Sequence, residues 1–321
     1  MTQSSSSPGN DNKFIKSNTV AIIGAPFSGG QGKGGVDDGP KELMKAGLES
    51  NIRNIGWTPE FHGHLEFEEP SSDPDIGRMK RPRFVANSTR KVYEAVKKAT
   101  TSNQLTLTVG GDHSIAIGTV AGVQAAHPDA VVLWIDAHAD LNTPDATESG
   151  NLHGCPVSFL LGAAKPKEGE EDVFGWVPKC LDEKRIAYIG LRDVDPFEKQ
   201  YIREHGITAY SMHDVDKHGI AKVVEMALKE VNPDGSRPIH LSFDVDALDP
   251  VFAPATGTPV RGGLTWREAC YLCEAVAETN NLVAMDLVEV NPHLGTDDKS
   301  ISDTVMSGIS LVKCALGDTL L

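Results

Sequence analysis

The chain has 321 residues, with 30 Lys and Arg against 45 Asp and Glu, so its formal net charge is −15. That charge argues against nonspecific binding to nucleic acid or to anionic membranes. No apolar stretch approaches the roughly 20 residues needed to span a bilayer. The hydrophobic content of 40% is ordinary for a globular protein with a sizeable core.

Apolar runs alternate with helical patterns along the chain. The predicted strands are 19–24, 105–109, 130–135, 185–190, 207–211, 239–243 and 282–288. The predicted helices are 39–50, 84–100, 115–126, 196–205, 220–231, 265–277 and 301–315. Strands that are apolar nearly throughout predict a parallel sheet covered by helices on both faces. The polar stretches 66–83 and 164–180 are expected to be solvated loops.

Residues 1–17 are Ser-rich and polar, without the apolar segment of a secretion signal, and we expect them to form a disordered tail. Residues 18–321 show no break in composition, which favours a single domain. Five scattered cysteines are typical of a reduced, cytoplasmic environment. Cys270 and Cys273 form a CxxC within a capped helical pattern. Because no second CxxC completes a zinc site, we interpret them as buried helix cysteines.

Three clusters of hard metal donors follow three of the predicted strands, where open α/β sheets build their sites. They are Gly110-Gly111-Asp112-His113, Asp136-Ala137-His138-Ala139-Asp140 and Asp244-Val245-Asp246. Oxygen and imidazole donors without thiolate favour Mn²⁺ over Zn²⁺. Two dications would neutralise the four aspartates of the last two clusters, so the charge count favours a binuclear centre for metal-assisted hydrolysis. We interpret Asp112 as a residue that orients His113 or caps the next helix.

The stretch from Asp136 to Asp140 is too long for one ion if it stays extended. At about 3.3 Å per residue its end Cα atoms would be roughly 13 Å apart. Either the backbone bends after His138, or the stretch serves two neighbouring ions, or both.

Other polar positions could converge on such a centre. A GxGxxG pattern at 30–35 begins well after its strand, so we interpret it as a loop at the rim of the site and not as a dinucleotide fingerprint. His153 could shuttle protons. Asp193 and Asp195 could accept hydrogen bonds from a cationic ligand, and Glu289 suits a guanidinium. Each of these is equally consistent with a turn former or a salt-bridge partner.

Together these motifs closely resemble the ureohydrolase family, and within it the arginases, from Ala25 to Pro292. The three donor clusters match the metal signatures of the whole family. The narrower resemblance to arginases rests on three loops, which are Ser149-Gly150-Asn151-Leu152-His153-Gly154, Arg192-Asp193-Val194-Asp195-Pro196 and Pro254-Ala255-Thr256-Gly257-Thr258-Pro259. The resemblance implies a three-layer α/β/α fold around an eight-stranded parallel sheet, with two Mn²⁺ per subunit.

The resemblance also implies roles for individual residues. One ion would be held by His113, Asp136, Asp140 and Asp244. The other would be held by Asp136, His138, Asp244 and Asp246, so that Asp136 and Asp244 bridge the pair. The residues expected to hold the amino acid end of the substrate are Asn142, Ser149, Asn151, Asp193 and Asp195. Glu289 and Thr258 would position the guanidinium, and His153 would relay protons.

The implied reaction is hydrolysis of L-arginine to L-ornithine and urea, in arginine catabolism. A hydroxide that bridges the ions would attack the guanidinium carbon, the ions and Glu289 would hold the tetrahedral intermediate, and Asp140 would pass a proton to the leaving nitrogen. We expect a homotrimer from Arg267 and Glu268, although the arginine-bearing tail that locks some arginase trimers is missing. Cys155 stands where many arginases have glutamine.

Three alternatives remain open on the sequence. A sibling enzyme of the same family would act on agmatine or guanidinobutyrate. A non-catalytic relative would act as a regulator, although the intact metal ligands speak against that. A metal-dependent deacetylase would need one zinc ion and a tyrosine donor, which nothing near the expected site supplies.

Overall fold

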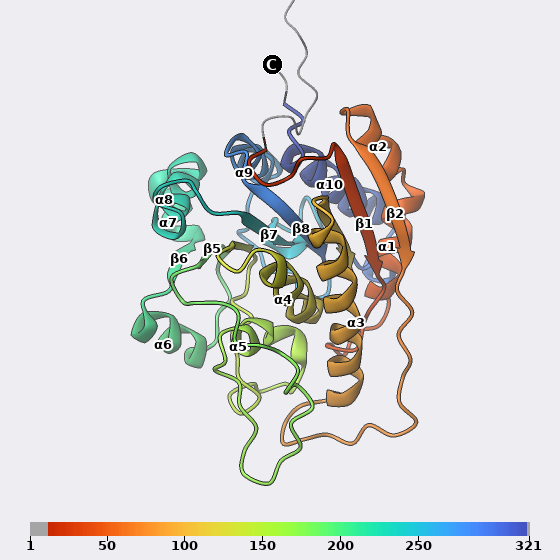
Figure 1. Cartoon of the computed structure of the whole chain (residues 1–321), viewed down its shortest axis with the longest axis vertical. Helices are drawn as coiled ribbons and strands as arrows, with labels where there is room; N and C mark the ends of the chain where they lie inside the picture. The colour runs from red at the N-terminus through yellow and green to blue at the C-terminus, as the bar shows by residue number, and fades with distance from the viewer. Residues whose placement is uncertain (1–11, 320–321) are drawn as a thin grey trace, which may run out of the picture.

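The computed structural model describes residues 12–319 of the chain and contains one parallel sheet. Its eight strands are β1 (Thr19–Ala25), β2 (Thr58–His64), β3 (Leu105–Gly110), β4 (Val131–Ile135), β5 (Ile186–Leu191), β6 (Thr208–Ser211), β7 (Ile239–Asp244) and β8 (Leu282–Val288). They lie in the order β2-β1-β3-β8-β7-β4-β5-β6, and every neighbouring pair is parallel (Figure 1). The predicted parallel, eight-stranded sheet is thereby confirmed.

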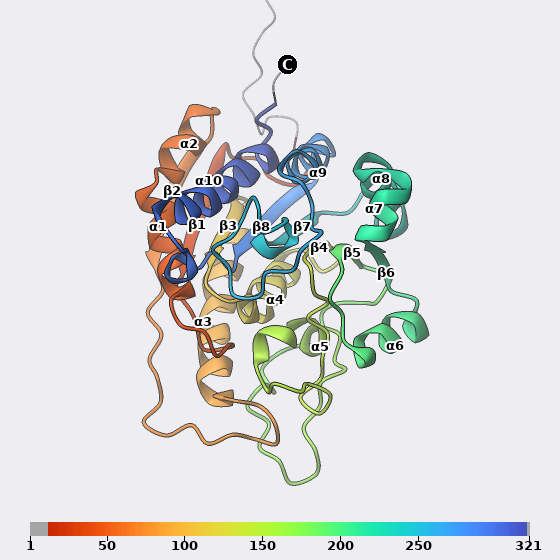
Figure 2. The ribbon, with the colours of Figure 1, turned by 180° about the vertical axis from the view of Figure 1, so that it is seen from behind.

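Helices cover both faces of the sheet and make the three-layer α/β/α architecture that was expected. They are α1 (Gly39–Lys45), α2 (Leu48–Asn54), α3 (Pro82–Thr101), α4 (Ala116–Ala126), α5 (Pro156–Leu160), α6 (Pro196–His205), α7 (Met212–His218), α8 (Ile220–Val231), α9 (Trp266–Glu278) and α10 (Asp298–Ala315). Helices α3 and α4 pack together on the face toward the viewer in Figure 1. Helices α8, α9 and α10 pack on the opposite face, which Figure 2 shows from the front. Within residues 12–319 no helix has both the length and the apolar content that crossing a bilayer requires.

The four central strands explain why the donors cluster where they do. Strands β3, β8, β7 and β4 are buried at every position, because helices cover both of their faces. Charged side chains are therefore excluded along most of their length and appear where the strands leave the core. Since the strands are parallel, their carboxyl ends meet at one edge, and this edge carries the site.

Strand β2 was not predicted, and its environment explains the miss. It is an edge strand whose residues alternate between exposed and half-buried positions. It also contains Pro59 and Gly63, which disfavour a central strand. Its pairing with β1 therefore depends on the rest of the sheet and leaves little signal in the sequence.

Two helical regions also differ from prediction. The single helix expected over 39–50 is two helices, because Gly47 adopts φ +93° between α1 and α2, in the left-handed region. The short helices α5 and α7 were not predicted. Both begin where a helix start is favoured, α5 with Pro156 at its first position and α7 with a capping box between Ser211 and Asp214.

The polar segments are more closely packed than expected. Residues 1–11 of the predicted tail lie outside the described residues. Residues 12–17 pack on the domain, since Ile15 is only 1% exposed and the Asn12 side chain donates to the Leu282 carbonyl at 2.8 Å. The two expected loops likewise bury Met79 and Phe174 in the core.

Candidate metal centre and substrate pocket

The three donor clusters converge at the carboxyl edge of the central strands. Asp136 directly follows β4, Asp244 ends β7, and His113 opens a short 3-10 turn after β3. Strand β8 lies between β3 and β7, and β7 pairs with β4, so the clusters belong to neighbouring parts of the sheet. The six donor side chains predicted from the sequence are thus brought into one region.

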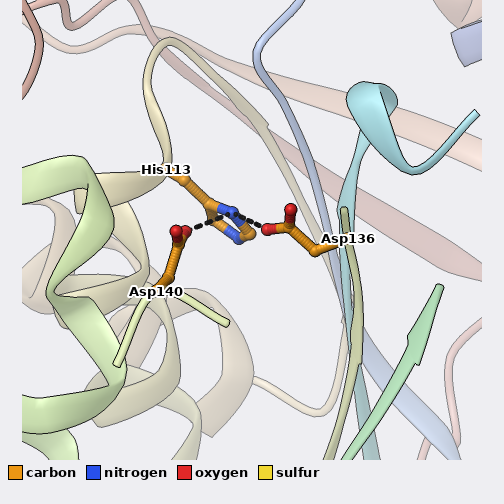
Figure 3. Close-up of side chains that lie close together, drawn as sticks. All are labelled: His113, Asp136 and Asp140. Carbon is orange, nitrogen blue, oxygen red and sulfur yellow. Dashed lines mark hydrogen bonds and ion pairs between the residues drawn. The ribbon is translucent and has the colours of Figure 1, made fainter. Parts of the chain in front are cut away.

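His113, Asp136 and Asp140 form the first group of donors, and all three are buried. The His113 Nδ1 atom lies 3.1 Å from Asp136 Oδ2 and 3.1 Å from Asp140 Oδ2. Figure 3 shows the imidazole between these two carboxylates. A third carboxylate oxygen, Asp244 Oδ2, is 3.5 Å from the same nitrogen. One ligand atom from each of the first three residues lies within 4.8 Å of the others, which is compact enough to hold one cation.

Asp136, His138 and Asp246 form the second group, with the same compactness. The His138 Nδ1 atom lies 3.3 Å from Asp136 Oδ1 and 3.1 Å from Asp246 Oδ2. The two oxygens of Asp136 therefore face different groups. Two adjacent cation sites that share this one carboxylate are the arrangement that the donors suit.

The backbone bends where the extended stretch would have separated the donors. Asp140 has φ +49°, in the left-handed region that residues other than glycine seldom adopt. The bend turns the Asp140 carboxylate toward His113, while His138 faces Asp246. The chain therefore bends, as one possibility had it, and the stretch contributes donors to two groups.

The buried aspartates require nearby positive charge. Burial and the neighbouring Asp136 raise the pKa of Asp140 to about 6. Burial and nearby aspartates also raise the pKa of Asp244 and of Asp246. Burial opposes the ionised form of Asp136 as well, but hydrogen bonds with His113 and His138 hold its pKa below the usual value. A hard, oxygen-rich donor set under this repulsion fits divalent cations.

Surrounding side chains fix the orientation of His113. Its Nε2 atom lies 2.9 Å from Ser242 Oγ, which donates to Asp286 Oδ2 at 3.3 Å. The Trp134 indole stacks on the imidazole with ring centroids 4.1 Å apart. These contacts leave Nδ1 to face the carboxylates. Metal-binding histidines are usually oriented in this way, by a hydrogen bond to the ring nitrogen that does not bind the metal.

Asp112 has the capping role that was one of its two interpretations. Its Oδ1 atom accepts from the Ser114 N–H at 3.0 Å at the start of the 3-10 turn. Its Oδ2 atom accepts from the Gly30 N–H at 2.7 Å, which ties the glycine-rich loop to the site. That loop therefore lies next to the site, where the Gly30 carbonyl also accepts from the His153 N–H at 3.0 Å.

Glu289 follows β8 with φ +66° and is only 1% exposed. Its Oε1 atom accepts from the His113 N–H at 2.9 Å, and its Oε2 atom accepts from Gln31 Nε2 at 2.7 Å. The His153 Nδ1 atom lies 3.4 Å from Oε1. Burial lowers the pKa of His153, but the Glu289 carboxylate outweighs this and raises it to about 9. Gln31 was not predicted, because the glycine pattern around it indicated only a flexible loop.

A cleft of about 220 Å³ opens beside the two donor groups. His138, Asp140 and Asp244 reach it from the donor clusters. The other predicted site residues that line it are Asn142, Ser149, Asn151, His153, Asp193, Asp195 and Thr258. Glu289 does not line the cleft, but lies beneath it against His153.

Hydrogen bonds hold two of the lining residues in place. Asn142 Nδ2 donates to Asp195 Oδ2 at 2.8 Å, while Asn142 Oδ1 is buried with no hydrogen-bond partner among residues 12–319. Thr258 Oγ1 donates to Asp246 Oδ2 at 2.9 Å, so it connects the cleft to the second donor group. An unpartnered acceptor beside a cleft is suited to a ligand donor.

Comparison with known proteins agrees with this geometry. The family model described as "Arginase family" matches residues 18–317. A curated arginase from Glaciozyma antarctica is 55% identical over 94% of this chain and 89% of its own length. The chain belongs to the arginase family. The crystal structure of arginase from Bacillus caldovelox covers 94% of this chain and 99% of its own, with 34% identity and a TM-score of 0.86.

The arginase fold is also found in more distant proteins. The crystal structure of a hypothetical agmatinase from Burkholderia thailandensis covers 95% of this chain and 87% of its own, with 22% identity and a TM-score of 0.69. That likeness shows the fold alone, so the choice of substrate must come from the residues that line the cleft.

The loop from Thr147 to Asn151 in this arginase-family chain is held from outside by Arg78 and Lys80, in a segment that was expected to be a solvated loop. Arg78 Nη1 donates to the Thr147 carbonyl at 2.8 Å, and the Lys80 N–H donates to the Gly150 carbonyl at 3.0 Å. Arg78 was missed because residues 66–83 were interpreted as a solvated loop.

Glu198 was also missed. At the start of α6 its two oxygens accept from the N–H groups of Leu141 and Asp195, at 2.8 and 2.9 Å. This carboxylate joins the bend after Asp140 to the loop of Asp195. Its capping-box position was the available signal.

We expect Mn²⁺ to stabilise the metal-free protein at pH 8 and much less at pH 5. The Asp140 carboxylate has a pKa raised from 3.8 to about 6. Without metal, the folded protein therefore loses stability as the pH rises from about 4 through about 6 and Asp140 ionises. Below about pH 6, protons compete with the cation for this carboxylate. Saturating Mn²⁺ should raise the melting temperature by about 5–10 °C at pH 8. Differential scanning calorimetry checks this, and an equal rise at both pH values would contradict it.

Proposed function

We propose that this chain hydrolyses L-arginine to L-ornithine and urea at a centre that holds two Mn²⁺. The observation that carries the proposal is the pair of His/Asp groups that share Asp136 beside a polar cleft, all of them buried except the half-buried His138. The identity of 55% with a curated arginase over 94% of the chain supports the same activity.

The chain offers a donor set for each ion. His113, Asp136, Asp140 and Asp244 would hold one, and Asp136, His138, Asp244 and Asp246 the other. The distances of 3.1–3.5 Å support the first set, and they support Asp136, His138 and Asp246 of the second. Asp244 enters the second set from the resemblance to arginases. When bound, a pair of such ions lowers the pKa of a water between them toward neutrality and polarises the group under attack.

Residues on the outer part of the cleft would bind the amino acid end of the substrate. Asp193 and Asp195 supply carboxylates that can accept from an α-ammonium group. Ser149 and Asn151 supply donors for an α-carboxylate, and Asn142 has a buried oxygen without a partner among residues 12–319. This combination of acceptors and donors suits an α-amino acid better than a simple amine.

Residues on the inner part of the cleft would hold the guanidinium and move protons. Glu289 lies behind the cleft against His153, and its oxygens accept from the His113 N–H and from Gln31 Nε2, so lone pairs remain for a guanidinium that reaches past His153. Thr258 also lies at this end of the cleft. Asp140 lines the cleft and can pass a proton to the leaving nitrogen. His153 is 18% exposed at its side chain, so its ring can exchange that proton with solvent.

The structure offers no support for the rival activities. The six expected metal donors are all present, which disfavours a non-catalytic regulator. Among residues 12–319, none of those that line the cleft is a tyrosine, whereas a deacetylase of related architecture would need one. An enzyme for agmatine remains the strongest alternative, because it would share the donor groups and would need no reader for a carboxylate.

We further propose that residues 18–321 form a single domain, on which residues 12–17 pack. We also propose a cytoplasmic location and a homotrimer. All five cysteines are free thiols, which suits a reducing compartment. Arg267 and Glu268 lie at the start of α9, where the resemblance expects a trimer contact. The Glu268 carboxylate already caps its own helix by accepting from the Thr265 N–H at 2.8 Å.

Substrate comparison tests the proposed activity. With Mn²⁺ bound, we expect kcat/KM for urea release to be at least about 100-fold higher on L-arginine than on agmatine, because agmatine leaves the carboxylate donors unpaired. The purified full-length chain is incubated with each compound and urea is measured. Equal rates, or a preference for agmatine, would refute the assignment.

Removal of one donor tests the metal sites. Asp246→Ala should lower the bound Mn²⁺ from two ions per chain to about one and kcat by at least about 100-fold, since the second group loses a carboxylate. Metal analysis and the urea assay measure both effects, and Asp216→Ala, at an exposed position, serves as the control. Full turnover with two ions bound to the Asp246 variant would show that the second site is wrong.

The support of the cleft loop gives a third test. Arg78→Met should raise KM for L-arginine by about 5- to 20-fold with a smaller change in kcat, because it removes a charged hydrogen bond to the loop that reads the amino acid end. Lys91→Met is the matched control, since Lys91 donates to the Glu66 carbonyl of the same segment at 3.1 Å without touching the loop. The idea fails if both variants change KM equally.

A further inference from the structure

Gln31 lies in the glycine-rich loop beside the site and is only 8% exposed. Its Nε2 atom donates to Glu289 Oε2 at 2.7 Å, across 258 residues of sequence. The other oxygen of this carboxylate, Oε1, accepts from the His113 N–H at 2.9 Å. A donor on each oxygen fixes the plane in which the Glu289 carboxylate lies.

The loop that carries Gln31 is held on both sides of this residue. Before it, the Gly30 N–H donates to Asp112 Oδ2 at 2.7 Å. After it, the Gly34 carbonyl accepts from Asn291 Nδ2 at 3.2 Å. The amide is therefore presented from a fixed backbone, which makes it a preorganised donor.

Gly257 leaves the room that the Gln31 amide occupies. A Cβ atom at position 257 would lie 2.9 Å from Gln31 Oε1 and 3.6 Å from Glu289 Oε2. The first distance is shorter than ordinary van der Waals contact, so a side chain there would displace the amide. The glycine-rich loop and the loop of Thr258, which are far apart in sequence, therefore meet at Glu289.

We propose that Gln31 is a positioning residue for the guanidinium of the substrate, through its hydrogen bond to Glu289. The inference rests on the proposed hydrolysis of L-arginine, in which Glu289 holds that group. A guanidinium binds a carboxylate through two parallel N–H bonds only when the planes of the two groups match. Because Gln31 and the His113 N–H set the plane of the carboxylate before the substrate enters, less binding energy is lost in ordering it.

A glutamine is well suited to this position. Its amide donates a hydrogen bond but has no net charge, so Glu289 keeps the negative charge that attracts a cation. Lysine or arginine in place of Gln31 would pair with the carboxylate and compete with the guanidinium. An apolar residue would leave Oε2 of the buried carboxylate without this donor, and the carboxylate could then turn away from its plane.

Comparison of substrate with product separates positioning from a general loss of structure. L-Ornithine has the same amino acid end as L-arginine but no guanidinium. Gln31→Leu, which removes the donor at similar size, should therefore lower kcat/KM for L-arginine by about 10- to 50-fold. The Kd of L-ornithine should stay within about twofold of the wild-type value. The urea assay and isothermal titration calorimetry measure the two effects on the full-length protein with Mn²⁺ bound.

Gly257→Ala should act in the same direction while Gln31 is kept. Its backbone φ lies outside the left-handed region, so alanine fits the chain, but the added methyl group would displace the amide. In the double variant the two losses should be much smaller than their product, since both break the same hydrogen bond.

Gln104→Leu is the matched control. Gln104 Nε2 donates to Glu60 Oε2 at 2.6 Å, which is the same kind of bond. This pair lies at the other end of the sheet, because Gln104 directly precedes β3 whereas the site follows it. The control variant should keep both kcat/KM for L-arginine and the Kd of L-ornithine within about twofold.

The outcomes distinguish this inference from the proposed function. A wild-type protein that releases no urea from L-arginine overturns both. An active wild type whose Gln31→Leu variant loses less than about threefold in kcat/KM, or loses affinity for L-ornithine to the same degree, overturns the role of Gln31 alone. If Gln31→Leu fails to fold, Gly257→Ala decides by the same two measurements.

Discussion

The repulsion among four buried aspartates at one edge of a parallel sheet is the constraint on which the rest of this molecule depends. Asp136, Asp140, Asp244 and Asp246 lie around two imidazoles in a region almost closed to water. Burial raises the pKa of three of them, so the group carries an electrostatic cost that two dications would remove. A bound cation would offset this cost, and binding would then contribute to the stability of the fold.

The fold makes that arrangement geometrically possible. Parallel strands buried on both faces deliver several polar residues to one edge, but they deliver them too far apart for a single cluster. Left-handed backbone at Asp140 and Glu289 corrects this, since it turns both carboxylates toward His113 and His153. Such strain is expected where function requires a side chain to leave the regular path of the strand.

The predictability of the site follows the same physics. Donor clusters at the ends of apolar runs could be predicted from the sequence. An apolar run indicates a buried strand, and the residue types that follow it indicate which metal donors are present. Gln31 and Arg78 could not be predicted, because their roles depend on hydrogen bonds to Glu289 and Thr147 across large sequence distances. Strand β2 was missed for a similar reason: an edge strand is fixed by its neighbours in space. The helix predicted over 39–50 was wrong for a local reason. The left-handed backbone at Gly47 interrupts a helical pattern that is continuous in the sequence.

Anomalous diffraction at the manganese edge from crystals grown with Mn²⁺ tests the central claim most directly. The account predicts two peaks, one on each side of the Asp136 carboxylate, with His113 beside one and His138 beside the other. A single peak, or two peaks that share no contact with Asp136, would contradict it.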